Sequence, residues 1–207
     1  MKTGKLIAAA GMVMVAGMTT ASAAITSVTG STNWLTTPPV SCVPFALNGP
    51  VAFTWDEQQN VTTSGQYCDM VNNPGSSGGA IAGVISGMFD SHFISYQDYS
   101  GLPPAVGTVT FNAPIVGVIF VGTTLDGTDV QWGAGGTTYP TLYPFRGLNF
   151  SSAFSILGNT ISFNLSTISP VIEVVQIRVL TAPIPTPGPM ALLGLGGLVA
   201  CRRRRND

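Results

Sequence analysis

Charged residues are scarce in this sequence, and lysine is confined to its start. Only 8% of the 207 residues are Asp, Glu, Lys or Arg, and there is a single histidine. Lys2 and Lys5 stand near the N-terminus and Arg202–Arg205 at the C-terminus, which leaves two arginines between residues 24 and 183. Eight carboxylates in that stretch set its net charge at two minus eight, or −6. A lysine-free, acidic stretch repels phosphate, so we expect no nucleic acid partner.

Helix-forming residues are the second shortage. Leu, Glu, Lys and Arg are few between residues 24 and 183, whereas Thr, Val, Ile, Phe, Ser, Gly and Asn are abundant. Residues of the second group suit the pleated, half-buried surface of a sheet. No apolar pattern of helical period extends over about ten residues between residues 24 and 183. Short runs between closely spaced turn residues predict about eight to ten strands. The predicted fold class is all-β, an antiparallel β-sandwich, for which a jelly roll is one possible arrangement.

The expected strands can be placed along the chain. They cover residues 51–55, 80–88, 92–97, 106–112, 115–121, 148–156, 160–165 and 171–180. Asp90-Ser91 and Gly158-Asn159 are expected to be turns, the second within a hairpin. Residues 123–136 are expected to form a turn-rich connection, because Asp126-Gly127 and a run of glycines interrupt them. Glu173 interrupts an otherwise apolar run, which predicts a last strand buried on both faces.

The N-terminus has the composition of a secretory signal peptide. Two lysines precede an apolar run from Leu6 to about Met18, and Ala21-Ser22-Ala23 forms a small-x-small cleavage site. We therefore predict a signal peptide at residues 1–23, a mature start at Ala24 and a single domain at residues 24–183.

The C-terminus has three parts in a fixed order. A proline-rich hinge begins at Ile184, an apolar run covers Met190–Cys201, and four arginines follow. As a helix, the 12 apolar residues would extend about 18 Å, whereas a bilayer core is about 30 Å thick. The arginines favour the cytoplasmic side of a membrane. This order predicts a temporary membrane stop, with a short hydrophobic helix, rather than a nucleic-acid-binding tail.

This tail resembles the PEP-CTERM sorting signals of exported bacterial proteins. Pro185 and Pro187 match the two prolines of that motif, and Thr186 stands where the motif has glutamate. The apolar run and Arg202, Arg203, Arg204 and Arg205 match the remainder. The resemblance implies that residues 184–207 are a sorting signal cleaved by an exosortase, a membrane protease. Secretion machinery and exosortase would then be transient partners, and the tail would hold the chain to the membrane before processing.

Cysteine is also scarce. Of three cysteines, Cys201 lies in the tail, whereas Cys42 and Cys68 remain in the domain. An even pair in an exported chain predicts a disulfide, which would stabilise the fold by about 3–4 kcal/mol. Two cysteines and one distant histidine do not make a zinc ligand set.

A Gly-x-Ser-x-Gly pattern at Gly75–Gly79 is the strongest catalytic motif. A nucleophile elbow needs a preceding strand and a following helix, whereas Asn-Asn-Pro precedes this motif and a β-like run follows. The one histidine, His92, stands in the wrong order for a triad with Ser77. We therefore predict a surface loop here and no enzymatic activity. Asp90 and His92 could form half of a metal site, and a surface histidine is the simpler interpretation.

Two further ligand sites are suggested by loop residues. Asp126 and Asp129 belong to an oxygen-rich turn, which could bind Ca²⁺ or form an Asx turn without metal. Trp132 and Tyr139 lie in a glycine-rich stretch and could stack on sugars at a sandwich rim, although aromatic residues also fill cores.

The two terminal signals and the lack of a catalytic set predict a non-enzymatic exported protein of the cell surface or extracellular matrix. A carbohydrate-binding β-sandwich module, with exopolysaccharide as its partner, is the alternative.

Overall fold

The computed structural model describes residues 20–99, 101–168 and 172–185. Residues 21–184 form one compact unit. Most of the predicted signal peptide lies outside the described residues, and so does most of the predicted sorting signal, including Thr186, Pro187 and Arg202–Arg205. The same holds for the predicted C-terminal hydrophobic helix. No helix within the described ranges is long and apolar enough to cross a membrane.

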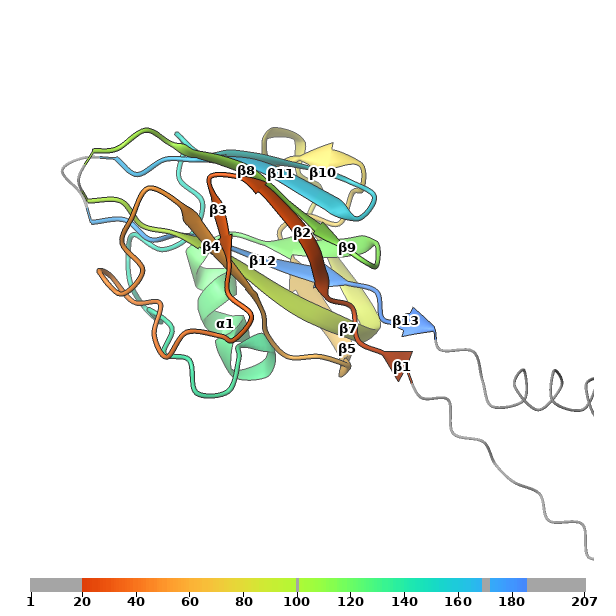
Figure 1. Ribbon diagram of the computed structural model, residues 1–207. Coiled ribbons are helices and arrows are strands. Elements are labelled where there is room, and N and C mark those ends of the chain that lie inside the picture. The colour runs from red at the N-terminus through yellow and green to blue at the C-terminus, as the bar shows by residue number, and fades with distance from the viewer. Residues whose placement is uncertain (1–19, 100, 169–171, 186–207) are drawn as a thin grey trace, which may run out of the picture. The chain divides into compact units, whose positions relative to one another are not determined.

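The domain is an all-β sandwich of two mainly antiparallel sheets, as predicted (Figure 1). The first sheet has five strands in the order β2 (Ile25–Gly30), β8 (Ala105–Phe111), β11 (Thr160–Leu165), β10 (Ala153–Leu157) and β6 (Gly75–Ser76). The second has the order β3 (Thr32–Trp34), β4 (Ala52–Asp56), β7 (Gly83–Tyr96), β12 (Val175–Thr181) and β9 (Ile115–Ile119), and β5 (Val61–Cys68) also pairs with β7. Two short strands, β1 (Thr20–Ala21) and β13 (Ile184–Pro185), pair with each other.

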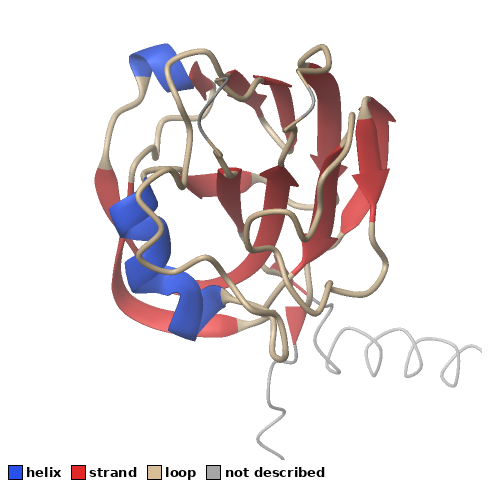
Figure 2. Cartoon of the chain, turned by 90° about the vertical axis from the view of Figure 1, so that its left-hand side faces the viewer, coloured by secondary structure: helices blue, strands red, loops and turns tan. Residues whose placement is uncertain are grey.

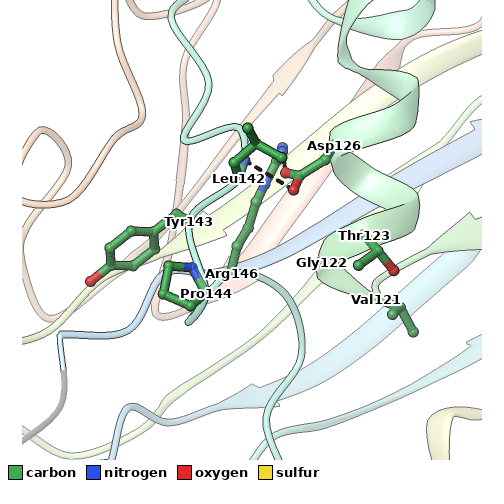
Figure 3. Close-up of a pocket in the computed structure, with 8 residues that line it drawn as sticks. All are labelled: Val121, Gly122, Thr123, Asp126, Leu142, Tyr143, Pro144 and Arg146. Atoms are coloured by element: carbon green, nitrogen blue, oxygen red, sulfur yellow. Dashed lines mark hydrogen bonds and ion pairs between the residues drawn. The ribbon is translucent and has the colours of Figure 1, made fainter.

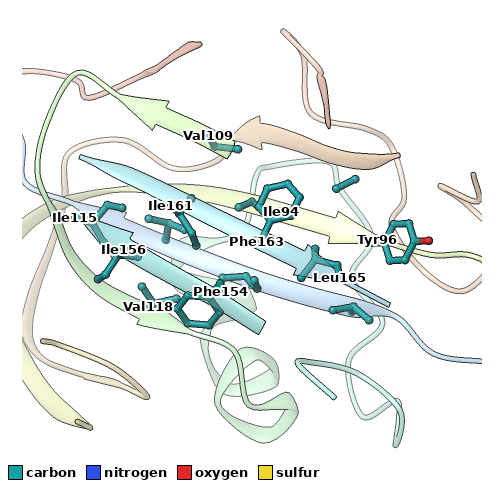
Figure 4. Close-up of a cluster of buried hydrophobic side chains, with 14 of the residues drawn as sticks. Ile94, Tyr96, Val109, Ile115, Val118, Phe154, Ile156, Ile161, Phe163 and Leu165 are labelled. Carbon is teal, nitrogen blue, oxygen red and sulfur yellow. The ribbon is translucent and has the colours of Figure 1, made fainter. Parts of the chain in front are cut away.

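The main hydrophobic core lies between these two sheets. Alternate residues of β8 and β11 are buried, as expected for strands with one face on a core and one in solvent. Phe154, Ile161 and Phe163 from the first sheet meet Ile94 and Val118 from the second (Figure 4). The predicted hairpin is confirmed, because Leu157 of β10 pairs with Thr160 of β11 around Gly158-Asn159.

A second core covers the other face of the second sheet. Every residue of β12 is buried, which confirms a last strand enclosed on both sides. Val175, Ile177 and Val179 belong to the main core, whereas Leu180 belongs to the second cluster. Because side chains alternate along a strand, Gln176 and Arg178 lie on the same face as Leu180. The sequence therefore places an arginine inside the second layer.

The 11-residue helix α1 (Gly122–Trp132) contributes to this second layer (Figure 2). The sequence prediction was wrong here, because a turn-rich connection was expected. Leu125, Thr128 and Trp132 are its buried residues, spaced as one helical face. Asp69 satisfies the start of the helix: its carboxylate accepts hydrogen bonds from the backbone N–H groups of Phe120 and Val121 (2.8 and 2.9 Å) and from the Thr124 hydroxyl (2.9 Å).

Two other differences concern strands. β7 continues without a break through Asp90-Ser91, where a turn was expected, because it pairs there with β12 at Thr181 and Leu180. The strands β2 and β5 were not predicted. Both contain many Thr, Ser and Gly residues, and at least half of the residues of each strand are exposed, so neither shows a clear apolar alternation.

Candidate functional site

The two arginines of the domain meet in one buried network beneath α1. Arg178 comes from β12, and Arg146 comes from the loop that follows the helix; both side chains are fully buried. Asp129 on α1 joins them, because its Oδ1 atom accepts hydrogen bonds from Arg146 at 2.9 Å and from Arg178 at 3.1 Å. We call Glu57, Asp126, Asp129, Arg146 and Arg178 the arginine network.

Glu57 is the main partner of Arg178. The guanidinium donates two hydrogen bonds to the carboxylate, from Nε at 2.7 Å and from Nη2 at 3.0 Å. Burial alone lowers the pKa of Arg178, but the charges of Glu57 and Asp129 outweigh that effect and hold the pKa above its ordinary value. Hydroxyl groups of Ser91 and Tyr139 also donate to Glu57. Burial and the Glu57 carboxylate raise the pKa of Tyr139, which therefore remains a neutral donor.

The predicted calcium ligands, Asp126 and Asp129, lie close together in the structure, but both bind the guanidinium of Arg146. Asp126 and Asp129 are three residues apart on α1, and Arg146 donates to both, at 2.7 and 2.6 Å. The second oxygen of Asp126 accepts the backbone N–H of Leu142 at 3.0 Å. A calcium ion at these two carboxylates would have to displace Arg146. In the described ranges, no three His, Cys, Asp or Glu side chains are grouped to hold a metal.

A surface pocket of about 330 Å³ adjoins the network (Figure 3). Its polar lining comes from Thr123, Asp126 and Arg146, and its remaining lining from Val121, Gly122, Leu142, Tyr143 and Pro144. Figure 3 shows the Asp126 carboxylate on the helix, facing both Leu142 and the Arg146 guanidinium. The volume falls within the range of small-molecule sites, which combine an apolar lining with a few polar groups. The pocket is therefore a candidate site for a small ligand.

The backbone geometry at Gly147 keeps the loop with Arg146 close to the sheet. Its φ is +104°, and a Cβ atom there would lie 2.6 Å from the carbonyl oxygen of Phe120. Glycine is the residue that accepts both conditions without strain. This close approach lets the Arg146 side chain enter the network from the loop.

The sugar-stacking prediction for Trp132 and Tyr139 was wrong in its placement. Trp132 is fully buried in the second core, and its indole N–H donates to Gln66 at 2.7 Å. Tyr139 is partly buried, and its ring packs edge-on against Phe93. The helical spacing of Leu125, Thr128 and Trp132 could have predicted that Trp132 is buried. The glycines in and after this segment suggested a loop instead.

The predicted disulfide is also absent. Cys42 and Cys68 are buried free thiols in the second core. The Cys42 thiol lies 3.6 Å from the Thr138 carbonyl oxygen, whereas the sulfur of Cys68 lies against Gly117. Each thiol thus fills its own place in the packing. Burial raises the pKa of both thiols to about 12.

The remaining candidates are structural in their contacts. His92 is fully buried rather than on the surface; it lies between Asp56 at 2.6 Å and the Thr181 hydroxyl at 3.0 Å. Asp90 points to other partners, the backbone N–H groups of Ala23 and Asn60. Ser77 starts a short 3₁₀ turn and accepts the backbone N–H of Phe154 at 3.2 Å.

No family model, curated protein or solved structure matches this chain.

Proposed function

We propose that this chain is a non-enzymatic exported protein of the cell surface or extracellular matrix, sorted by its C-terminal signal. The observation that carries the proposal is the extent of the compact unit, residues 21–184. Its first and last residues lie within three residues of the ends of the domain, 24–183, that the two terminal signals predict. The boundaries support a domain that keeps its core when both signals are removed.

The chemistry of the domain supports a binding or structural role. Its buried histidine is enclosed by Asp56 and Thr181, and burial holds both thiols protonated near neutral pH. The arginine network is satisfied by internal hydrogen bonds. Such groups stabilise a scaffold, and the jelly-roll arrangement of that scaffold stays a prediction.

Substitution of the motif prolines in the native host tests the proposal. In the Pro185→Ala/Pro187→Ala variant we expect the tail to be retained and the protein to stay with the membrane fraction. Pro189→Ala changes a proline of the same segment outside the matched pair and should leave processing unchanged. The intact mass and the cell fraction of each variant are the measurements. Loss of the tail and normal surface delivery in the double variant would overturn the proposal.

Carbohydrate binding remains the second candidate, and we propose the pocket beside α1 as its site. Its Tyr143 ring and the exposed Thr123 hydroxyl line the pocket and offer the combination of stacking and hydrogen bonding that neutral sugars use. A glycan array with the purified protein tests it. Tyr143→Ala should abolish binding, whereas Tyr67→Ala, an exposed tyrosine on β5, should not. Binding that survives Tyr143→Ala, or no binding at all, rejects this site.

A further inference from the structure

Two carboxylates hold the start of the domain at one end of the sandwich. Asp90 is fully buried on β7, and it accepts hydrogen bonds from the backbone N–H groups of Ala23 and Asn60. Asp56, at the end of β4, accepts the N–H of Ile25 at 3.2 Å. The chain on either side of Ala24 is thus bound to an acidic side chain.

This end of the domain is short of positive charge. The two arginines of the domain hydrogen-bond with Glu57, Asp126 and Asp129 in the arginine network. Asp56 has His92 as a neighbour, and the partners that we find for Asp90 are backbone N–H groups. A buried carboxylate is stabilised more strongly by a charged donor than by a neutral one.

We infer that Asp90, together with Asp56, which binds the same N-terminal segment, is the binding site for the α-ammonium group that signal-peptide removal creates at Ala24. The inference rests on the export part of the proposed function. Hydrolysis of the Ala23–Ala24 bond consumes one water, leaves the new carboxyl group on Ala23 and leaves an amine on Ala24 that takes up a proton. Neutral N–H donation from Ala23 to Asp90 is thereby replaced by a charged donor.

The exchange requires the nitrogen of Ala24 to move by about one residue step toward Asp90. The nitrogen of Ala24 follows that of Ala23 by one residue, a step of about 3.5 Å in an extended chain. It already hydrogen-bonds to Asn112 Oδ1 at 2.8 Å. An ammonium has three N–H donors, so the group can keep Asn112 as a partner while it donates to Asp90. Processing would then lock the first strand onto the domain and make the mature chain more stable than the unprocessed one.

The composition of the chain supplies a specific probe. Lysine occurs only at positions 2 and 5, so a chain that begins at Ala24 has a single amine, its α-amine. We would prepare residues 24–207 with Ala24 as the first residue and label them with an amine-reactive reagent. In the folded protein we expect labelling at least tenfold slower than in urea. Asp90→Asn should raise the labelling rate of the folded protein toward that of the unfolded protein. The control is Asp69→Asn, which changes a carboxylate that hydrogen-bonds near the start of α1 and should leave the labelling rate of the folded protein low.

A second comparison does not need the variants to fold. Acetylation of Ala24 removes the charge, and we expect it to raise the equilibrium constant for unfolding about tenfold in the otherwise unchanged chain. Equal stability of the free and acetylated forms, or equally fast labelling of folded and unfolded protein, would overturn the inference. Both measurements use purified protein, so their outcome is separate from the tail-processing experiment in the host.

Discussion

Arg178 and Glu57 form a buried, two-point ion pair between residues 121 positions apart, with contacts of 2.7 and 3.0 Å. The pair lies between the second sheet and α1 and is completed by Thr128, which accepts from Arg178 Nη1 at 2.6 Å. It joins the last long strand to the segment after β4 and to the helix. The pair therefore holds together parts of the second layer that are distant in sequence.

Removing one member of this pair should destabilise the domain strongly. Arg178→Met leaves the buried Glu57 charge without its main partner, at a cost of about 3–5 kcal/mol in the free energy of unfolding. Arg178→Met/Glu57→Gln removes both charges and should recover part of that loss. Urea unfolding followed by tryptophan fluorescence gives the values. A double variant no more stable than the single one would show that the packing, rather than the charge, matters.

Stability should fall at alkaline pH because of the two thiols. Their folded pKa values are raised by burial to about 12 from an ordinary value of 9.0. Between pH 9 and 12 the unfolded chain loses these protons while the folded chain keeps them, so each thiol reduces stability by up to about 1.4 kcal/mol per pH unit. Urea midpoints measured from pH 8 to 10 should decline less steeply in Cys42→Ala/Cys68→Ala. An unchanged slope in that variant would assign the effect to the tyrosines instead.

The same thiols should be present as free groups but protected. Iodoacetamide should modify neither Cys42 nor Cys68 in the folded protein, and both in urea without a reducing agent, because burial excludes the reagent and holds the thiols protonated. Intact mass after each reaction is the measurement. If urea alone exposes no reactive thiol from this pair and prior reduction restores it, the protein does contain the disulfide.

Asp69 should contribute to α1 through the first turn of the helix. Asp69→Ala removes the acceptor for two backbone N–H groups and the Thr124 hydroxyl, and should cost about 1–2 kcal/mol. Asp69→Asn keeps one oxygen acceptor and should cost less. Chemical unfolding of the two variants gives the ranking, and equal losses would indicate that the negative charge, rather than the acceptor, stabilises the helix start.

The all-β class and several strands could be predicted because local pattern is sufficient for them. β11 was placed at its observed bounds, since alternating apolar residues follow a clear turn at Gly158-Asn159. Helix α1 could not be predicted: Gly122 and Gly127 and its β-branched residues disfavour a helix locally. It forms because Asp69 binds the two residues just before the helix and the Thr124 hydroxyl of its first turn, and because Trp132 and Leu125 complete the second core.

The candidate site was predicted only in fragments. Asp126 and Asp129 were selected as an acidic pair, but Arg146 and Arg178 carried no local signal that they would bind there. Trp132 was selected as a surface residue because neighbouring glycines suggested a loop. Each of these assignments depended on which face of an element points inward, and that depends on contacts between distant segments.

The amino-acid sequence by itself determined the scarcity of charge and the β-rich composition. It also determined that a chain beginning at Ala24 has one amine, and the order of prolines, apolar residues and arginines at the C-terminus. These follow from residue identity and short-range spacing. Only the tertiary structure decided that both cysteines stay free, that His92 is buried, and that the arginines share Asp129. The reason is that burial and pairing depend on which strands become neighbours, and the strands on either side of Arg178, β7 and β9, are far from β12 in the sequence.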